Sequence, residues 1–379
     1  MKFERLNPVT KEIASSSEAM DADRCRKICD RAQAGFAAWS AKGPAERRAI
    51  LNKAADELQA RQDQFIKAMV TEIGATPGWA GFNVAFASNM AREAAAITTQ
   101  IEGKVIPSEF PRLAMAIREP VGVVLGIAPW NAPVILGVRA IAVPLACGNS
   151  VVFKASESCP ETHRLIVEAF HAAGVPEEAL GFVTNRPEDA AEIVGELIDH
   201  QAVRRINFTG STRVGRIIAE RAARHLKPCV LELGGKAPLI ILEDADIGEA
   251  VKAASFGAFM NSGQICMSTE RIIVVDAVAD EFSKQFADKV KTYKTGDPSG
   301  EPSHLGAVVD DRTVGHVNEL IADALGAGAS LSVDGRGDSV VMAPSVVEGV
   351  TPEMRLFSEE SFGPVVGVIR ARDEAHAQS

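Results

Sequence analysis

Residues 121–154 read VGVVLGIAPWNAPVILGVRAIAVPLACGNSVVFK. Residues 121–127 and 150–154 are two short apolar runs, and the apolar segment 134–146 between them has the length of a helix. Strands that are apolar along their whole length are typical of a parallel sheet with both faces covered. The sequence therefore predicts two parallel strands joined by a crossover helix.

The same alternation continues towards the C-terminus. Further strands are expected at 181–184, 205–209 and 229–233, with helices at 161–173, 190–199 and 211–226. A second alternation begins after Gly235, with strands expected at 238–242, 271–275, 340–347 and 365–369 and helices at 247–261, 279–291 and 313–325. The predicted fold class is therefore α/β, with two sheets whose carboxyl edges are the expected ligand sites.

The N-terminal part follows another pattern. Apolar residues at helical spacing over 21–100 predict three helices, and residues 103–119 predict two short strands joined by a polar turn. A lone hairpin is marginally stable in water, so we expect this one to pack against another domain or subunit. We accordingly divide the chain into a first domain (1–102 and 120–233), the hairpin arm, and a second domain (234–379).

Length, charge and cysteine usage exclude several functions. The chain has 379 residues, enough for two domains, and its formal net charge of −10 argues against nucleic acid and anionic membranes as partners. Residues 1–6 are charged with no apolar core after them, and Arg139 and Pro144 interrupt the longest apolar run, so neither a signal peptide nor a membrane span is expected. The six scattered cysteines predict reduced thiols in the cytoplasm. Cys25 and Cys29 are four residues apart with no matching His or Cys pair nearby, so no metal site is expected there.

Residues 261–268, NSGQICMS, place Cys266 in a loop between an expected helix and an expected strand. A cysteine on such a loop can face a cleft, and its thiolate would be a nucleophile. Because a free thiol is mostly protonated at neutral pH, this chemistry requires a base, an oxyanion donor and an electron acceptor. The alternative for Cys266 by itself is a small buried apolar cysteine.

Two strand ends carry residues that suit a dinucleotide. Residues 208–215, FTGSTRVG, end a strand and open a helix, a context that favours a phosphate, although Ser211 and Thr212 depart from the usual glycine-rich pattern. Lys154 and Glu157 follow another strand and could bond a ribose diol, and Glu157 would repel a 2′-phosphate. The alternatives are an ordinary glycine-opened helix and a solvated ion pair.

Two further strand ends carry candidates for the base and the oxyanion donor. Asn131, flanked by Pro129 and Pro133, offers an amide donor at a fixed place, although it could instead cap the following helix. Glu232 follows an apolar strand and precedes two glycines that allow close backbone approach. We expect its carboxylate to be buried and to act as a general base.

In this order and spacing, the segments resemble the aldehyde dehydrogenase superfamily over essentially the whole chain. The similar stretches are 129–131, 154–157, 208–215, 232–236, 263–266 and 359–364. Residues 263–271 and 136–139 are most similar to bacterial aromatic aldehyde dehydrogenases of the salicylaldehyde and vanillin type. The resemblance implies a Rossmann-type dinucleotide-binding domain, a catalytic α/β domain and a β-hairpin oligomerisation arm for the three parts defined above.

The resemblance also implies an activity, the NAD-dependent oxidation of an aldehyde to its carboxylic acid. Cys266 would form a thiohemiacetal whose oxyanion Asn131 and the Cys266 backbone N–H stabilise, and Glu232 would activate the water that hydrolyses the ensuing thioester. The implied cofactor contacts are Pro129, Trp130, Lys154, Glu157, Phe208, Gly210, Ser211, Thr212, Arg213, Val214, Gly215, Leu233, Glu360 and Phe362. NAD is expected rather than NADP, and the implied partners are a small aldehyde and, for a full-length chain, one or three further copies.

Substrate contacts are expected from Arg139, Ile265 and Met267. Arg139 lies eight residues after Asn131, a little over two helical turns, so both side chains can face one cleft. It would then meet a phenolic or other polar substituent of an aromatic aldehyde. The alternative is a structural ion pair between Arg139 and a carboxylate that the sequence does not identify.

The chain ends at Ser379, where members of the superfamily usually continue, so we expect a fragment or a prematurely ended chain with an incomplete second domain. Two other functions remain open. One is a CoA-acylating aldehyde dehydrogenase, which would need no water-activating base such as Glu232. The other is an inactive chain that binds only a dinucleotide or a partner subunit.

Overall fold

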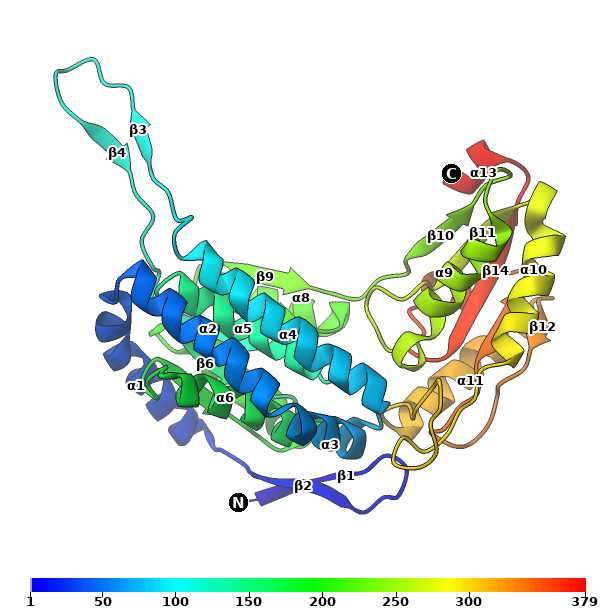
Figure 1. Ribbon diagram of the computed structural model, residues 1–379, viewed down its shortest axis with the longest axis horizontal. Coiled ribbons are helices and arrows are strands. Elements are labelled where there is room, and N and C mark those ends of the chain that lie inside the picture. Colours follow the sequence, from blue (N-terminus) through cyan, green and yellow to red (C-terminus); the bar gives the residue numbers. More distant parts are fainter. Residues whose placement is uncertain (1) are drawn as a thin grey trace. The chain divides into compact units, whose positions relative to one another are not determined.

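The structure is a computed structural model that describes residues 2–379, and its chain divides between two units (Figure 1). The first unit comprises the described residues up to Arg5, Ile13–Ala68 and Gly81–Leu233. The second comprises Leu6–Glu12, Met69–Ala80 and Gly234–Ser379.

A five-stranded parallel sheet forms the centre of the first unit. Its order is β7-β6-β5-β8-β9, with β5 at Val123–Ile127, β6 at Ser150–Lys154, β7 at Leu180–Val183, β8 at Val203–Thr209 and β9 at Cys229–Glu232. Every residue of β5 and β6 is buried, as their apolar sequences predict. The chain builds β6 and β7 on one side of β5 and then crosses to β8 on the other. The strand order therefore reverses between β5 and β8, where such sheets bind ligands at their carboxyl edge.

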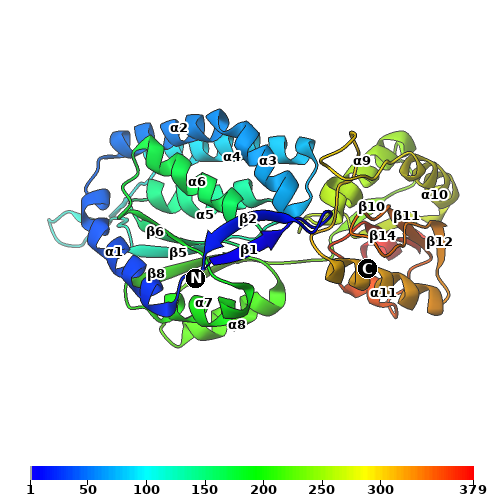
Figure 2. The same cartoon turned by 90° about the horizontal axis from the view of Figure 1, so that it is seen from below.

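Helices cover both faces of this sheet. One face carries α5 (Pro133–Ala146) and α6 (Pro160–Ala173) beneath α2 (Pro44–Ala60), and the other carries α1 (Ala22–Ser40), α7 (Ala190–Asp199) and α8 (Thr212–Ala223), as Figure 2 shows. Helices α3 (Gln62–Ile73) and α4 (Pro77–Ile97) and the short 3-10 helix η1 (Pro187–Asp189) complete the helices up to β8. Cys25 and Cys29 lie in the core between α1 and the sheet, where burial raises their pKa values to about 11 and about 12. These two thiols therefore stay protonated.

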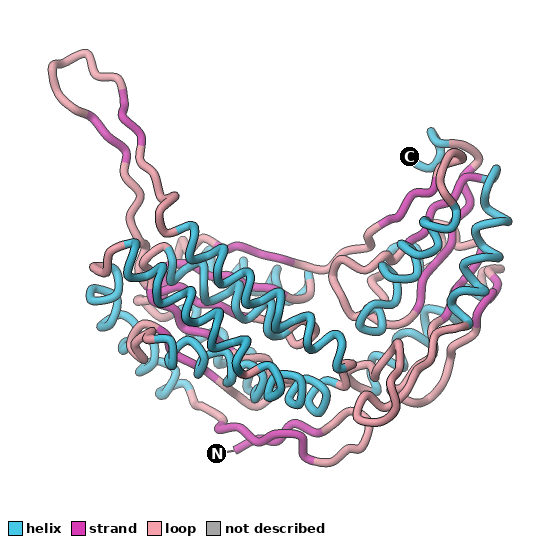
Figure 3. The backbone as a smooth tube through the Cα atoms, viewed as in Figure 1, coloured by secondary structure: helices cyan, strands magenta, loops and turns pink. Residues whose placement is uncertain are grey.

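The expected hairpin consists of β3 (Lys104–Ile106) and β4 (Ala114–Ala116), paired antiparallel with Val105 opposite Met115. It extends away from the sheet and helices of the first unit, with a long loop between its strands (Figure 3). Its apolar side chains are largely exposed, among them Val105, Phe110 and Leu113. The hairpin is thus held by few contacts within its own unit.

The second unit has a sheet of order β10-β11-β14-β13-β12, formed by β10 (Pro238–Ile241), β11 (Arg271–Val275), β12 (Ser330–Val333), β13 (Ser345–Glu348) and β14 (Val365–Ala371). Helices α9 (Ile247–Phe259) and α10 (Asp276–Lys291) pack on one face, α11 (Asp311–Gly326) packs on the other, and η2 (Met260–Gly263), α12 (Arg355–Ser358) and α13 (Glu374–Gln378) are short. The predicted α/β architecture is confirmed. The antiparallel edge strand β12 was not predicted, and the strand expected at 340–347 begins only after Pro344, which cannot donate a ladder hydrogen bond.

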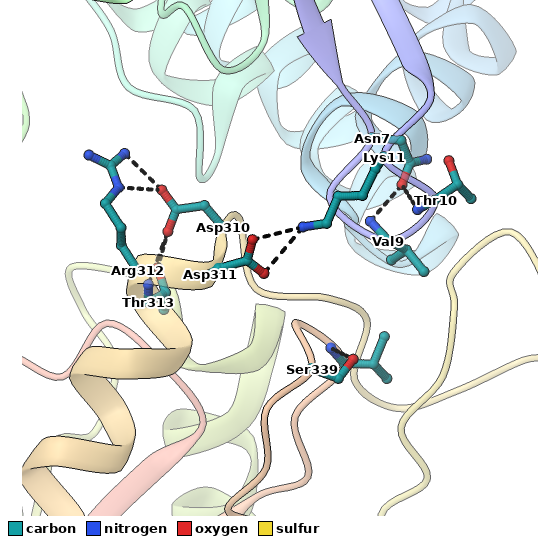
Figure 4. A network of polar contacts seen from close by, with 10 residues as sticks. Asn7, Val9, Thr10, Lys11, Asp310, Asp311, Arg312, Thr313 and Ser339 are labelled. Atoms are coloured by element: carbon teal, nitrogen blue, oxygen red, sulfur yellow. Dashed lines mark hydrogen bonds and ion pairs between the residues drawn. The ribbon is translucent and has the colours of Figure 1, made fainter.

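Two N-terminal segments belong to the second unit, whereas the expected division placed residues 1–102 wholly in the first. The Ala307 N–H donates to the Gly74 carbonyl over 2.9 Å, and the Lys11 ammonium pairs with Asp311 at 3.0 Å (Figure 4). The Asn7 side chain accepts from the N–H groups of Val9 and Thr10 and so holds the turn that presents Lys11. These contacts join residues far apart in the chain, which hydrophobic periodicity does not reveal.

Within residues 2–379, none of the helices combines the length and the apolar character that crossing a membrane would require.

Candidate active site

The carboxyl edge of the first sheet collects most of the predicted residues of the first unit. Residues 128–132 follow β5, residues 155–159 follow β6, residues 210–211 join β8 to α8, and Leu233 follows β9. Since the strands are parallel, these connections lie at one edge. Pro129 and Trp130 are half-buried there and Phe208 is buried at the end of β8.

Lys154 and Glu157 form an ion pair at the end of β6, with the lysine side chain only 5% exposed. The Asn185 amide donates to the same Glu157 carboxylate over 2.7 Å. The pair is therefore largely buried and hydrogen-bonded at the edge of the sheet. The alternative interpretation, a solvated ion pair, does not describe it. Asn185, which follows β7, was not predicted, because a lone asparagine after a strand carries no signal of its own. A carboxylate fixed in this way can accept hydrogen bonds from the hydroxyls of a ribose.

The segment 208–215 forms the N-terminus of α8. Ser211 is the N-cap residue, and its side chain accepts from the Val214 N–H over 3.4 Å. Thr212 and Arg213 are exposed in the first turn, where backbone N–H groups have no partner within the helix. Gly210 donates its N–H to the Glu232 carbonyl over 3.0 Å, and an added Cβ at Gly215 would collide with Leu233. The turn thus fits an anion, and Gly215 lets the Leu233 side chain pack closely against it.

Asn131 is buried between β5 and α5, and the N-cap residue of that helix is Ala132. Asn131 therefore does not occupy the N-cap position of α5, the alternative considered for it. His163, a residue that was not predicted, accepts from the Ser156 N–H over 3.0 Å, and its ring also hydrogen-bonds the backbone of Pro133. Complete burial lowers the pKa of His163 to about 3, so its ring is neutral. This histidine ties the connection that carries Asn131 to the connection that carries Glu157.

Glu232 and Arg139 line one cavity of about 590 Å³ in the first unit, together with Val124, Val143 and Asn207. The expected burial of Glu232 is wrong: its side chain is exposed, because β9 is the edge strand of the sheet and its residues alternate between half-buried and exposed. A general base must reach water, and an exposed carboxylate on a cavity wall meets that condition.

Arg139 is half-buried on α5, and its guanidinium donates to the Thr209 hydroxyl over 2.9 Å. Among the residues that the structure describes, no carboxylate lies within ion-pair distance of it, so the alternative of a structural ion pair is wrong. A guanidinium has five N–H donors in a planar fork. Arg139 can therefore offer further donors to a polar group in the cavity.

In the second unit, Cys266 lies in the loop between η2 and β11 and is partly exposed. Asn261, Ser262 and Gly263, just before it, all have positive φ angles (50°, 56° and 73°), a backbone region that non-glycine residues rarely adopt. Such a conformation persists only where surrounding contacts impose it, and it is found most often at functional sites.

Gln264 supplies several of those contacts. It is 1% exposed; its amide oxygen accepts from the Val309 N–H over 2.9 Å, and its amide nitrogen donates to the carbonyls of Asn261 and Ala307 over 3.1 and 3.3 Å. A Cβ at Gly263 would collide with the Gly363 carbonyl. The loop that presents Cys266 is therefore fixed on two sides, and Ile265 and Met267 flank the thiol, with Met267 exposed.

Glu360 and Phe362 lie on the segment that precedes β14. The Glu360 carboxylate accepts from the Gly235 N–H over 3.3 Å, and an added Cβ at Gly234 would collide with it. Burial raises the pKa of Glu360. The close approach expected of these glycines is thus made by Gly234, and Gly235 contributes its N–H to the same carboxylate. Among residues 2–379 no group of three or more His, Cys, Asp or Glu side chains is placed to hold a metal ion.

These features define a class of protein: a parallel α/β unit whose carboxyl edge fits a dinucleotide, on one chain with an α/β unit that presents a partly exposed cysteine on a constrained loop. The chain belongs to the Aldehyde dehydrogenase family, whose sequence profile matches residues 1–379. Members of this family use NAD(P) to oxidise aldehydes.

The chain is similar to several characterised proteins. It is 54% identical to the vanillin dehydrogenase of Pseudomonas fluorescens over 98% of its own length and 77% of that protein. A salicylaldehyde dehydrogenase structure from Pseudomonas putida G7, complexed with salicylaldehyde, superposes with a TM-score of 0.98 at 45% identity and covers 100% of this chain and 78% of that chain. An NAD-dependent benzaldehyde dehydrogenase from Corynebacterium glutamicum gives a TM-score of 0.95 at 36% identity, with coverages of 100% and 82%.

Proposed function

We propose that this protein oxidises an aromatic aldehyde to the carboxylic acid, with NAD as the hydride acceptor. The observation that carries the proposal is the partly exposed Cys266 thiol on a loop fixed by buried hydrogen bonds. In contrast, Cys25, Cys29 and Cys159 are fully buried, and burial raises the pKa values of Cys147 and Cys229. The relatives named above act on vanillin, salicylaldehyde and benzaldehyde, which supports an aromatic substrate.

The proposed chemistry assigns one role to each of three residues. The Cys266 thiolate forms a bond to the aldehyde carbon, and the Asn131 amide and the Cys266 backbone N–H stabilise the resulting oxyanion. Loss of a hydride from that carbon leaves a thioester on Cys266. Glu232 then takes a proton from water, which attacks the thioester and releases the carboxylic acid and the free thiol.

We further propose that the first unit holds the dinucleotide. Lys154 and Glu157 would bind the adenosine ribose, the N-terminus of α8 would bind the pyrophosphate, and Glu360 and Phe362 of the second unit would contact the nicotinamide half. The exposed apolar residues of the hairpin support assembly into a homodimer or homotetramer.

The parent protein is expected to prefer NAD to NADP. The Glu157→Gln substitution should reduce the ratio of kcat/KM for NAD to kcat/KM for NADP about tenfold, the equivalent of about 1.4 kcal/mol. The reason is that a carboxylate fixed beside the ribose repels a 2′-phosphate. The measurement is kcat/KM for both cofactors. Glu168→Gln, on the helix α6 that follows the turn of Glu157, is the control, since its carboxylate pairs with Arg164 and not with Lys154. Equal use of NAD and NADP by the parent would contradict the assignment.

Arg139→Ala tests the aromatic substrate. We expect kcat/KM for hydroxylated benzaldehydes to fall roughly tenfold to a hundredfold more than kcat/KM for benzaldehyde, because removing a polar interaction from a desolvated site costs about 1–3 kcal/mol. Arg118→Ala, which alters another arginine on the same cavity wall, is the control and should not discriminate between these aldehydes. An equal loss for both aldehydes with a lower Tm would show that Arg139 is structural.

A further inference from the structure

We propose that Glu270 is a positioning residue that holds the segment 360–362 beside the loop of Cys266. The inference rests on the proposed roles of Cys266, Glu360 and Phe362. Glu270 lies four residues after Cys266, and its side chain is 4% exposed. A carboxylate with so little exposure to solvent is stable only if its charge is paired and its oxygens accept hydrogen bonds.

The partners of Glu270 come from two other segments. Its carboxylate accepts from the Lys236 ammonium over 2.6 Å, from the Ser361 hydroxyl over 2.6 Å, and from the backbone N–H groups of Ser361 and Phe362 over 3.1 and 3.3 Å. Successive backbone N–H groups that converge in this way form an anion-binding nest. Here the bound anion is a side chain of the protein itself.

The nest explains the backbone of Phe362. Its φ angle is 45°, in the left-handed region that costs a non-glycine residue on the order of 1–3 kcal/mol. Two N–H groups directed at one carboxylate offset part of this cost. Without that carboxylate the turn would lose its anion, and the N–H of the buried Ser361 would lose this acceptor.

Lys236 connects Glu270 to the segment 234–237, which also contacts Glu360. Its side chain is 8% exposed, and burial lowers its pKa although the neighbouring Glu270 opposes this. The adjacent Gly235 donates its N–H to the Glu360 carboxylate, and the Glu270 N–H donates to the Ala237 carbonyl over 3.0 Å. Glu270 therefore joins three segments, 234–237, 264–271 and 359–363, all within the second unit.

The test uses Glu270→Gln in the full chain. The amide would place a donor against the nest and leave Lys236 without its counter-ion. We expect the dissociation constant for NAD to rise about tenfold or more, kcat to fall, and hydrogen exchange of the Ser361 and Phe362 amides to accelerate in the absence of NAD. Glu270→Asp keeps the carboxylate and should restore part of the NAD affinity.

Glu359→Gln is the matched control. It removes a carboxylate from the same segment and breaks an ion pair with Arg355, but it leaves the nest intact. NAD affinity and amide exchange should stay within about twofold of the parent. If Glu270→Gln does not fold, Ser361→Ala removes only the hydroxyl contact and should give a smaller change in the same direction.

The proposal is overturned if Glu270→Gln binds NAD and exchanges the two amides as the parent does. It is also overturned if Tm falls while NAD affinity and amide exchange do not change, because Glu270 would then serve stability alone. Failure of the proposed function is a separate result: the parent would bind NAD without oxidising aldehydes, and the binding and exchange measurements would still decide the role of Glu270.

Discussion

Cys266→Ser is expected to lower kcat for aldehyde oxidation by up to about 10⁶-fold, the order of the loss when a serine nucleophile alone is removed from a protease. The hydroxyl is far less ionised than the thiol and cannot form the thiohemiacetal at a useful rate. NAD affinity should remain close to that of the parent, since the predicted cofactor contacts do not include this side chain. Steady-state NADH formation and calorimetric NAD binding measure the two effects.

Cys229→Ser is the control for this change. Cys229 is a half-buried thiol on β9, and burial raises its pKa. Its replacement should leave kcat within about twofold of the parent. A Cys266→Ser protein that still oxidises aldehydes at the parent rate would show that the thiol is not the nucleophile.

Glu232→Gln is expected to stop the reaction at the thioester. One equivalent of NADH should form per active site and later turnovers should slow by about 10²- to 10⁴-fold, because a general base contributes that much to the attack of water. Mass spectrometry should find the acyl group on the peptide that contains Cys266. Glu220→Gln, an exposed carboxylate on α8, is the control and should turn over normally.

Addition of CoA to Glu232→Gln separates water from a thiol as the acceptor. A CoA thiolate needs no water-activating base, so a CoA-acylating enzyme would turn over at the parent rate and release an acyl-CoA. The hydrolytic route predicts that the trapped thioester persists. Parent-rate hydrolysis by Glu232→Gln without CoA would remove Glu232 from the mechanism.

Local pattern predicted most elements of the two sheets. The run 121–154 became β5, α5 and β6 with nearly the expected bounds, because strands buried on both faces must be apolar along their length. The hairpin at 103–119 was also found, since its two short strands surround a polar turn. The edge strand β12 was missed, because four residues with mixed polarity carry little periodic signal.

By itself, the sequence determined the family, the α/β class and which residues follow the strands, because strand ends, glycines and a loop cysteine are local features. Only the tertiary structure decided which residues contact these site residues and how exposed they are. The exposure of Glu232 depends on β9 lying at the edge of the sheet, and the bond from Arg139 to Thr209 joins α5 to β8. Gln264 and Glu270 meet partners about 45 and 90 residues away in the chain. Such contacts arise from folding in three dimensions, and neither spacing nor composition encodes them.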